Sequence, residues 1–207
     1  SKVNFELSEE QKMIQQSVER FVQESYDLPT RVKLSGEDVG FSKDYWSSMA
    51  ELGWLGLPFS EEDGGFGGNQ IDIIVIMEQF GRGLVLEPFL SGVVMAGGAI
   101  KRGGNKNLKQ EFLSALIEGT KQLSFGYAEI QSRFDLEDVA TTAKKDGDTY
   151  IINGQKSMVL NAESADAIVI SARTDGAQVD KSGISLFLID ADSEGVEKEN
   201  FPTVDGL

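Results

Sequence analysis

Apolar residues recur at helical spacing through the first half of the chain. The clearest case follows Ser8 and Gln11, which have the spacing of a capping box and precede an apolar face that runs from Ile14 to Val22. The same periodicity, interrupted mostly at glycines, predicts further helices over residues 42–53, 71–83, 88–100 and 108–119. We therefore expect residues 1–121 to form an N-terminal α-helical domain.

The period of the pattern changes to two after residue 121. Apolar residues alternate with smaller or polar ones from Leu123 to Tyr127, and Asp146-Gly147 is a strong hairpin signal because both residues tolerate positive φ. Strands are expected over residues 123–127, 139–145, 149–152, 167–172 and 184–189. Residues 122–207 are therefore expected to form an antiparallel β unit, either a barrel or a sandwich.

Several helices followed by several strands, without alternation, indicate an α+β fold with two domains: an N-terminal all-α domain and then an antiparallel, barrel-like β-domain. The tail Asn200–Leu207 carries no further strand pattern. A sheet that stops there leaves an edge strand open, and soluble proteins normally cover such edges. We therefore expect the native polypeptide to be longer than these 207 residues.

Composition rules out several kinds of chemistry. The 207 residues contain no histidine and no cysteine, so they cannot form a disulfide, a thiol nucleophile, an imidazole-based triad or a zinc site made of thiolates or imidazoles. With 34 acidic against 19 basic residues, the formal net charge is −15, which repels the phosphate backbone of nucleic acids. We expect no metal site and no nucleic-acid partner.

The chain carries no targeting pattern and no membrane span. Its first residues lead into an acidic amphipathic stretch and lack the apolar run of a leader peptide. The most apolar windows, Ile71–Met77 and Val93–Ile100, are far shorter than the roughly 20 residues that a membrane-spanning helix needs. We expect a cytoplasmic protein.

Five segments, in the same order along the chain, resemble those of the acyl-CoA dehydrogenases. Gly53–Gly68 is similar to that family's glycine-rich turn, Met77–Gly81 to its next helix, and Asn107–Gly119 to the helix that leads into its β-domain. Tyr150–Lys156 and Asn161–Asp166 resemble its asparagine-glycine-x-lysine hairpin and the alanine-aspartate strand start that follows. Each segment alone is common, but the ordered set covers nearly the whole chain.

The resemblance implies a helical domain, a middle β-domain and a C-terminal four-helix domain that is absent from this chain. It implies FAD as cofactor and an acyl-CoA as substrate, with a glutamate that takes the α-proton while a hydride leaves the β-carbon for the flavin. It also implies an electron-transferring flavoprotein as partner and a homo- or hetero-oligomer. The family's glutamate base belongs to the C-terminal domain, so we expect no catalytic residue within these 207 residues.

Two further details resemble one branch of this family. Pro88–Leu90 and Ile184–Asp190 are similar to a divergent group that acts on bulky acyl-CoA substrates, including those with steroid side chains. Some members of that branch work as pairs of unlike subunits that share one active site. The resemblance therefore leaves open whether the partner subunit is identical or different.

The same register implies where the flavin binds. The family's threonine-glutamate-proline falls on Ala128–Ile130, its glycine-serine-aspartate turn on Arg133–Asp135, and its tryptophan-x-threonine on Met158–Leu160. The expected cofactor-binding residues are Phe125, Tyr127, Ala128, Phe134, Met158, Val159 and Leu160, and Phe134 is also the expected substrate-binding residue. Because three polar or aromatic contacts are replaced, backbone groups along 125–134 are expected to hold the ring, with Met158 packed on its face.

Each of these positions also has a structural interpretation. Alternating aromatic residues suit a strand with or without a ligand, Glu129 is expected as a hydrogen-bonded carboxylate at a strand end, and Lys156, directly after a turn, is expected to be exposed. Two other functions stay open. One is a structural partner subunit of a heteromeric acyl-CoA dehydrogenase, and the other is a flavin oxidase or monooxygenase on the same scaffold.

Overall fold

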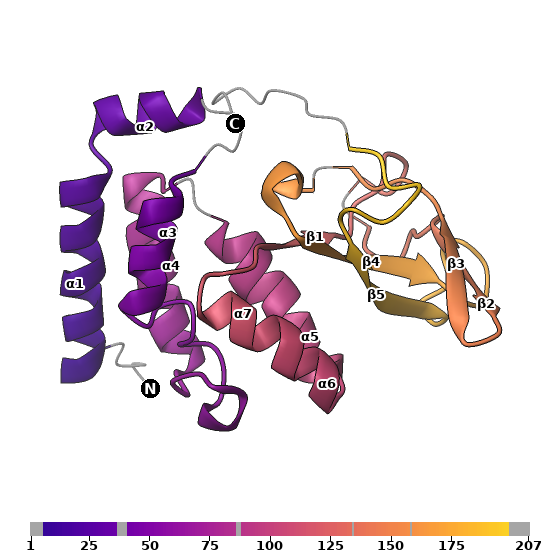
Figure 1. Cartoon of the computed structure of the whole chain (residues 1–207), viewed down its shortest axis with the longest axis horizontal. Coiled ribbons are helices and arrows are strands. Elements are labelled where there is room, and N and C mark those ends of the chain that lie inside the picture. The colour runs from indigo at the N-terminus through magenta and orange to yellow at the C-terminus, as the bar shows by residue number, and fades with distance from the viewer. Residues whose placement is uncertain (1–5, 37–40, 86–87, 134, 158, 199–207) are drawn as a thin grey trace, which may run out of the picture.

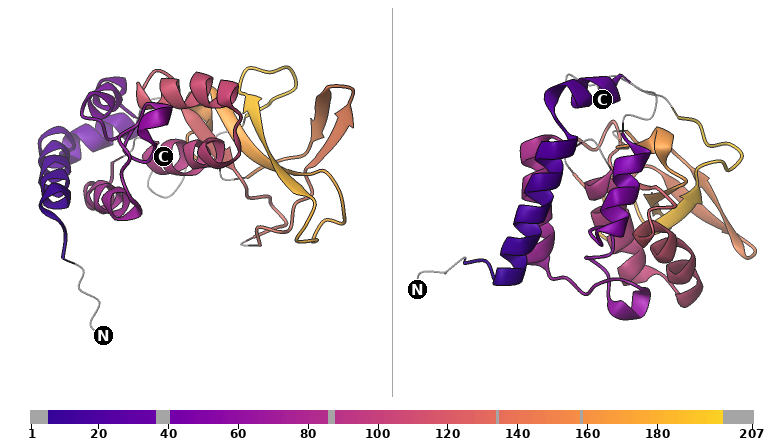
Figure 2. Two further views of the ribbon diagram at one scale, coloured as in Figure 1. Left: turned by 90° about the horizontal axis from the view of Figure 1, so that it is seen from below. Right: turned by 60° about the vertical axis from the view of Figure 1, so that its left-hand side comes forward.

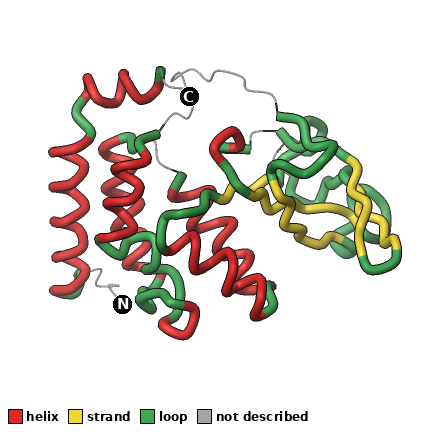
Figure 3. The backbone as a smooth tube through the Cα atoms, in the orientation of Figure 1, coloured by secondary structure: helices red, strands yellow, loops and turns green. Residues whose placement is uncertain are grey.

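The computed structural model describes residues 6–36, 41–85, 88–133, 135–157 and 159–198. Helices gather on one side and strands on the other (Figures 1 and 3). The helices are α1 (Glu9–Ser25), α2 (Leu28–Ser35), α3 (Lys43–Glu51), α4 (Gln70–Gly83), α5 (Gly98–Gly103), α6 (Lys106–Leu108), α7 (Ser114–Ile117), the π-helices η2 (Phe89–Gly97) and η3 (Lys109–Leu113), and the short turns η1 (Glu61–Asp63) and η4 (Ala162–Ser164). The strands are β1 (Leu123–Gly126), β2 (Thr142–Asp146), β3 (Thr149–Asn153), β4 (Ala167–Arg173) and β5 (Ile184–Asp190). Among the described helices, none is both long enough and apolar enough to cross a membrane.

Side-chain caps fix where the longer helices begin. The Gln11 backbone N–H donates to the Ser8 hydroxyl at 3.1 Å, and the Gln11 side-chain oxygen accepts from the Ser8 N–H at 3.0 Å, which confirms the predicted capping box. Asn69 and Asp72 form a second capping box at the start of α4, and at α3 the Ser42 hydroxyl accepts the Tyr45 N–H. These caps satisfy backbone donors that have no partner within the helix.

Helix α2 was not predicted from the sequence. Asp27 caps it and Pro29 occupies its first turn, so its local start signals are sound. Only Leu34 is buried, however, whereas Leu28 and Val32 are 67% and 64% exposed. Without an apolar stripe, the helix produces no periodic signal.

The helices and the beginning of the sheet share one hydrophobic core. Trp46 and Phe59 of the helical part are almost fully buried, and Leu123 of β1 and Val169 of β4 belong to the same cluster of contacting residues. The sheet is therefore attached to the helices through the β1–β4 end, as the two views of Figure 2 show. The division into domains 1–121 and 122–207 stays a prediction.

The backbone of η2 lies directly against β1. A Cβ atom at Gly92 would stand 2.6 Å from the carbonyl oxygen of Leu123, so a larger residue could fit only if one of the two backbones moved. Strand β1 is thus placed by close backbone contact with a π-helix, an element that is often found at functional sites.

The sheet is mixed, which corrects the prediction of a purely antiparallel β unit. Strand β5 pairs antiparallel with β4 along its whole length, and β2 with β3 form the predicted antiparallel hairpin. Strand β1, however, pairs parallel with β4, and β2 meets the end of β4 in parallel at Thr142 and Arg173. A turn sequence predicts pairing only between two strands that follow each other directly in the chain. The hairpin lies between β1 and β4 in the chain, so no turn signal encodes their pairing.

Arg173, at the end of β4, is a buried cation whose contacts are backbone carbonyl groups. Its side chain is packed inside the sheet domain, with the residue only 6% exposed. The guanidinium donates to carbonyl oxygens at 2.7 to 3.4 Å, those of Glu137, Val139, Asp175, Gln178, Asp180 and Ser182. One side chain therefore ties two loops to the central strand.

Candidate functional site

Two segments that are about 30 residues apart in the sequence lie side by side where the sheet meets the helices. The Ser157 N–H donates to the carbonyl oxygen of Ala128 at 2.8 Å. A Cβ atom at Gly126 would stand 3.2 Å from Cγ2 of Val159, so the chain after β1 passes close to the chain after β3. The structure thus brings the segment 125–128 next to Ser157 and Val159 of the segment 157–160.

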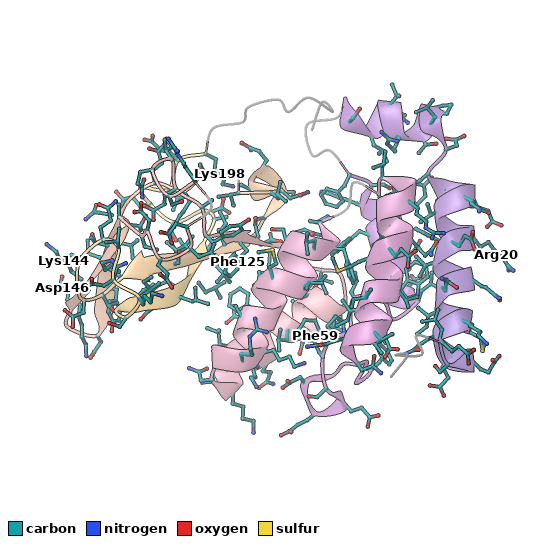
Figure 4. The ribbon with its side chains drawn as sticks, turned by 180° about the vertical axis from the view of Figure 1, so that it is seen from behind. Arg20, Phe59, Phe125, Lys144, Asp146 and Lys198 are labelled. Atoms are coloured by element: carbon teal, nitrogen blue, oxygen red, sulfur yellow. The ribbon has the colours of Figure 1, made fainter. Side chains whose placement is uncertain are left out.

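The expected cofactor-binding residues in these segments differ in exposure. Phe125 is half-buried against the common core, at the junction of sheet and helices (Figure 4), and its ring centroid lies 5.9 Å from that of Tyr127. Tyr127 is 40% exposed and Leu160 is 52% exposed, while Ala128 and Val159 are half-buried. These five residues therefore leave a partly open, largely apolar surface.

Two of the expected site residues, Phe134 and Met158, lie outside the described residues. Their neighbours Arg133 and Val159 are described, and Arg133 adopts a positive φ of 50°. The role of all seven expected residues in binding a cofactor stays a prediction.

Two buried serines connect this surface to the helical part, and the sequence analysis did not include them. The Ser124 hydroxyl donates to the carbonyl oxygen of Leu160 at 2.5 Å and lies 3.3 Å from the hydroxyl of Ser91 in η2. The Ser91 oxygen also accepts the Phe125 N–H at 3.2 Å. The sequence offered one indication of this connection, the single serine, Ser91, inside the apolar run 89–97.

An ion pair lies just beneath the same two segments. The Lys156 ammonium is 2.8 Å from Oε2 of Glu129, and the two side chains are 7% and 3% exposed. Oε1 of Glu129 accepts the backbone N–H groups of Ala140 and Thr141 at 3.0 and 3.1 Å. Lys156 is therefore buried, and the expectation that it would be exposed is wrong, because the turn before it directs the side chain onto a carboxylate.

The charges of this pair are held by each other and by polar groups around them. Burial raises the pKa of the Glu129 carboxyl, but hydrogen bonds from Lys156 and Gln131, together with the lysine's charge, outweigh burial and hold that pKa below its ordinary value of 4.5. Burial lowers the pKa of Lys156, and Glu129 opposes this effect. The carboxyl of Glu129 is therefore ionised near neutral pH, and its oxygens are already engaged by hydrogen-bond donors, so it is not free to take a proton from a substrate.

Other titratable clusters are few. Among the described residues, no group of three or more acidic side chains is placed to hold a metal ion. The Glu129–Lys156 pair is the most deeply buried of the ion pairs found in the same residues. The chemistry of the site therefore depends on an apolar surface backed by one buried ion pair.

Comparison with known proteins identifies the family of both halves. The model for "Acyl-CoA dehydrogenase, N-terminal domain" matches residues 8–120, and that for "Acyl-CoA dehydrogenase, middle domain" matches residues 124–207. Probable acyl-CoA dehydrogenase YngJ of Bacillus subtilis is 32% identical over 197 residues, which are 94% of this chain and 51% of YngJ. The chain spans about half the length of the curated relatives it matches.

Two further matches carry names that describe assemblies or ligands. The caffeyl-CoA reductase-Etf complex subunit CarC of Acetobacterium woodii is 32% identical over 193 residues, 92% of this chain and 50% of CarC. The solved FAD complex of PigA superposes with a TM-score of 0.81 at 26% identity, over 93% of this chain and 51% of PigA. Because the two family models together cover nearly the whole chain in order, the chain belongs to the acyl-CoA dehydrogenase family.

Proposed function

We propose that the protein to which these 207 residues belong is an FAD-dependent acyl-CoA dehydrogenase, which removes hydrogen from Cα and Cβ of an acyl-CoA thioester. The observation that supports this proposal is the juxtaposition of segments 125–128 and 157–160. The family's pattern assigns these segments to the flavin, and here they form a partly open apolar surface beside the helices. The complex of the related protein PigA with FAD supports the choice of cofactor.

The residues of this surface fit a flat, largely apolar ring. Tyr127 presents an exposed aromatic ring that ends in a phenol hydroxyl, Leu160 presents an exposed apolar side chain, and Ala128 and Val159 are small enough to admit a close approach. None of these four places a side-chain amide or aliphatic hydroxyl on the surface, so most hydrogen bonds to the polar edge of the ring must come from backbone groups. FAD supplies the hydride acceptor, while this chain binds and orients the ring.

The proton of the substrate must be taken by a group outside the described residues. Glu129 directly follows Ala128 of the proposed ring site, and its oxygens already accept hydrogen bonds from Lys156 and from the backbone of Thr141. A general base needs a free oxygen within hydrogen-bond reach of the proton it removes. We therefore place the base in the part of the protein that follows residue 207.

We further propose an electron-transferring flavoprotein as the acceptor and an oligomeric assembly with one or two kinds of subunit. The name of CarC places that relative in a complex with such a flavoprotein, which supports the proposed acceptor. The cytoplasmic location that the sequence indicates stays a prediction.

The test compares the full-length protein with residues 1–207 alone. Each is mixed with saturated acyl-CoAs of several chain lengths and with a steroid side-chain thioester, in the presence of added FAD and an artificial electron acceptor. We expect the full-length protein to be yellow and to reduce the acceptor, and the fragment to produce no turnover. Activity of the fragment that disappears in Glu129→Gln would contradict the proposal, because it would place the base in this chain.

A second candidate is a non-catalytic subunit of a heteromeric acyl-CoA dehydrogenase. It is favoured by Ala128 and Leu160, which offer no side-chain hydrogen bonds at the two positions where the family pattern has threonine. The two candidates differ in flavin content: a catalytic subunit retains FAD when purified alone, whereas a structural subunit does so only together with its unlike partner.

A further inference from the structure

The described residues 127–130, Ser157 and Val159–Leu160 lie outside the strands of the sheet. Strand β1 ends at Gly126 and β3 ends at Asn153, so within the described residues neither segment is part of a strand. Their direct polar connections to each other are the hydrogen bond from Ser157 to Ala128 and the ion pair of the residues next to these, Lys156 and Glu129. The main-chain hydrogen bond and the adjacent ion pair join the two segments directly, and the Ser124 hydroxyl of β1 also holds Leu160 through its carbonyl oxygen.

The ion pair is itself fixed to other parts of the β-domain. Oε1 of Glu129 accepts two backbone N–H groups of the segment 140–141, which leads into β2. The Lys156 ammonium also donates to the hydroxyl of Ser171 in β4 at 2.9 Å. Because both charged groups are buried, water and salt screen their attraction little. The pair therefore holds the two segments at a defined place relative to the sheet.

We propose that the Glu129–Lys156 ion pair is a positioning element for the flavin: it holds Ala128 and Ser157 at the separation that the ring requires. This inference rests on the proposed function. Neither side chain needs to touch the ring, because the pair acts through Ala128 on one segment and Ser157 on the other. Groups that fix the residues around a bound cofactor commonly decide how well that cofactor binds.

The first test replaces both charged residues at once. The variant Glu129→Gln with Lys156→Met removes the ion pair without leaving an unpaired buried charge, and it keeps the shapes of both side chains close to the original. The full-length protein is freed of flavin, and its FAD dissociation constant is measured by the change in flavin fluorescence. We expect FAD to bind about 10-fold or more weakly, with an altered absorbance spectrum of the bound flavin.

A matched control removes an ion pair far from these segments. Asp63 and Lys109, 3.9 Å apart in the helical part, are 18% and 30% exposed. The variant Asp63→Asn with Lys109→Met leaves the net charge unchanged, as the first variant does. We expect its FAD affinity and flavin spectrum to equal those of the unmodified protein. An equal loss of affinity in both variants would overturn the inference, because it would show a general effect of removing ion pairs.

A second variant covers the case in which the double variant does not fold. Ser171→Ala removes the hydroxyl that anchors Lys156 to β4, while the ion pair with Glu129 remains. We expect FAD affinity to fall about two- to tenfold, the range for one hydrogen bond, with a loss of folding stability no greater than that of one hydrogen bond. Unchanged FAD affinity in a folded Ser171→Ala or double variant would overturn the inference while the proposed function stands. If the unmodified full-length protein binds no FAD, the proposed function and this inference both fail.

Discussion

At the scale of single residues, burial shifts the pKa values of Glu129 and Lys156 in opposite directions: it raises that of the carboxyl and lowers that of the ammonium group. Burial alone favours the neutral form of each group, yet the folded protein keeps the carboxylate ionised because four hydrogen-bond donors surround it. In the unfolded chain the carboxyl binds a proton near its ordinary pKa of 4.5, and in the folded protein only at lower pH. Folding therefore gains stability from this group above pH 4.5 and loses it as the pH falls through the folded pKa.

The first prediction at this scale follows from this pH dependence of folding stability. Glu129→Gln should lower the free energy of unfolding by roughly 3–5 kcal/mol at neutral pH, because Lys156 is left as an unpaired buried cation. The difference from the unmodified protein should shrink as the pH falls below about 4.5, because the carboxyl of the unfolded chain binds a proton there before that of the folded protein does. Urea unfolding at a series of pH values measures both quantities. A difference that stays constant down to the lowest pH would show that the carboxylate is not the group responsible.

The residues of the candidate site could be predicted only where a motif carried them. The family pattern named Ala128 and Val159, and the structure brings their segments together, while their binding role stays a prediction. No motif pointed to Ser91 or Ser124, because a serine in an apolar helix or strand looks the same whether its hydroxyl is bonded or not. The burial of Lys156 was equally hidden, since its carboxylate partner lies 27 positions away in the sequence.

At the scale of elements, the packing of α1 against α4 depends on one glycine. A Cβ atom at Gly83 of α4 would stand 1.9 Å from Cγ1 of Val22, a buried and stiff side chain of α1. Two residues earlier in the same helix, a Cβ atom at Gly81 would have no neighbour within 4 Å. The two positions differ in their neighbours and not in their helical backbone, so they form a matched pair.

Alanine at these two positions should therefore have opposite effects. Gly83→Ala should destabilise the protein by about 1–3 kcal/mol, the usual cost of overpacking a closely packed contact. Gly81→Ala should stabilise it by about 0.5–1 kcal/mol, because alanine loses less conformational freedom in a helix than glycine does. Thermal or urea unfolding of both variants measures the difference. Equal effects at the two positions would show that α1 moves away from α4 without cost.

The elements themselves could be predicted where local signals exist. The capped, strongly periodic α1 and the hairpin at Asp146-Gly147 were predicted, and both are present. The helix α2 was missed because it buries little, and the parallel pairing of β1 with β4 was missed because it joins strands about 40 residues apart. Pairing of that kind is decided by the core that both strands complete, which no local pattern records.

At the scale of the whole molecule, the common core connects the stability of the helices with that of the sheet. Leu123 and Val169 of the sheet pack in the same cluster as Trp46 and Trp54 of the helical part. Neither part can lose its structure without exposing apolar surface of the other. Parts of a chain that complete the same core are expected to unfold cooperatively.

We therefore expect one unfolding transition for the described part of the chain. Both tryptophans of the sequence lie in the helical part, so their fluorescence reports on the helices, whereas hydrogen exchange of the β4 amides reports on the sheet. The free energies of unfolding from the two probes should agree, and Gly83→Ala should lower both equally. Loss of the sheet signal at a lower denaturant concentration than the tryptophan signal would show that the two parts unfold separately.

Arg173 has a consequence for the loop that follows β4. The segment 174–183 is rich in glycine and charged residues and looks, by composition, like an easy place for a protease to cut. Its backbone carbonyl groups, however, are the partners of a buried guanidinium. A protease can cut the loop only after it has left its place, and leaving would strip a buried cation of its acceptors. The loop should therefore resist digestion for as long as β4 stays folded.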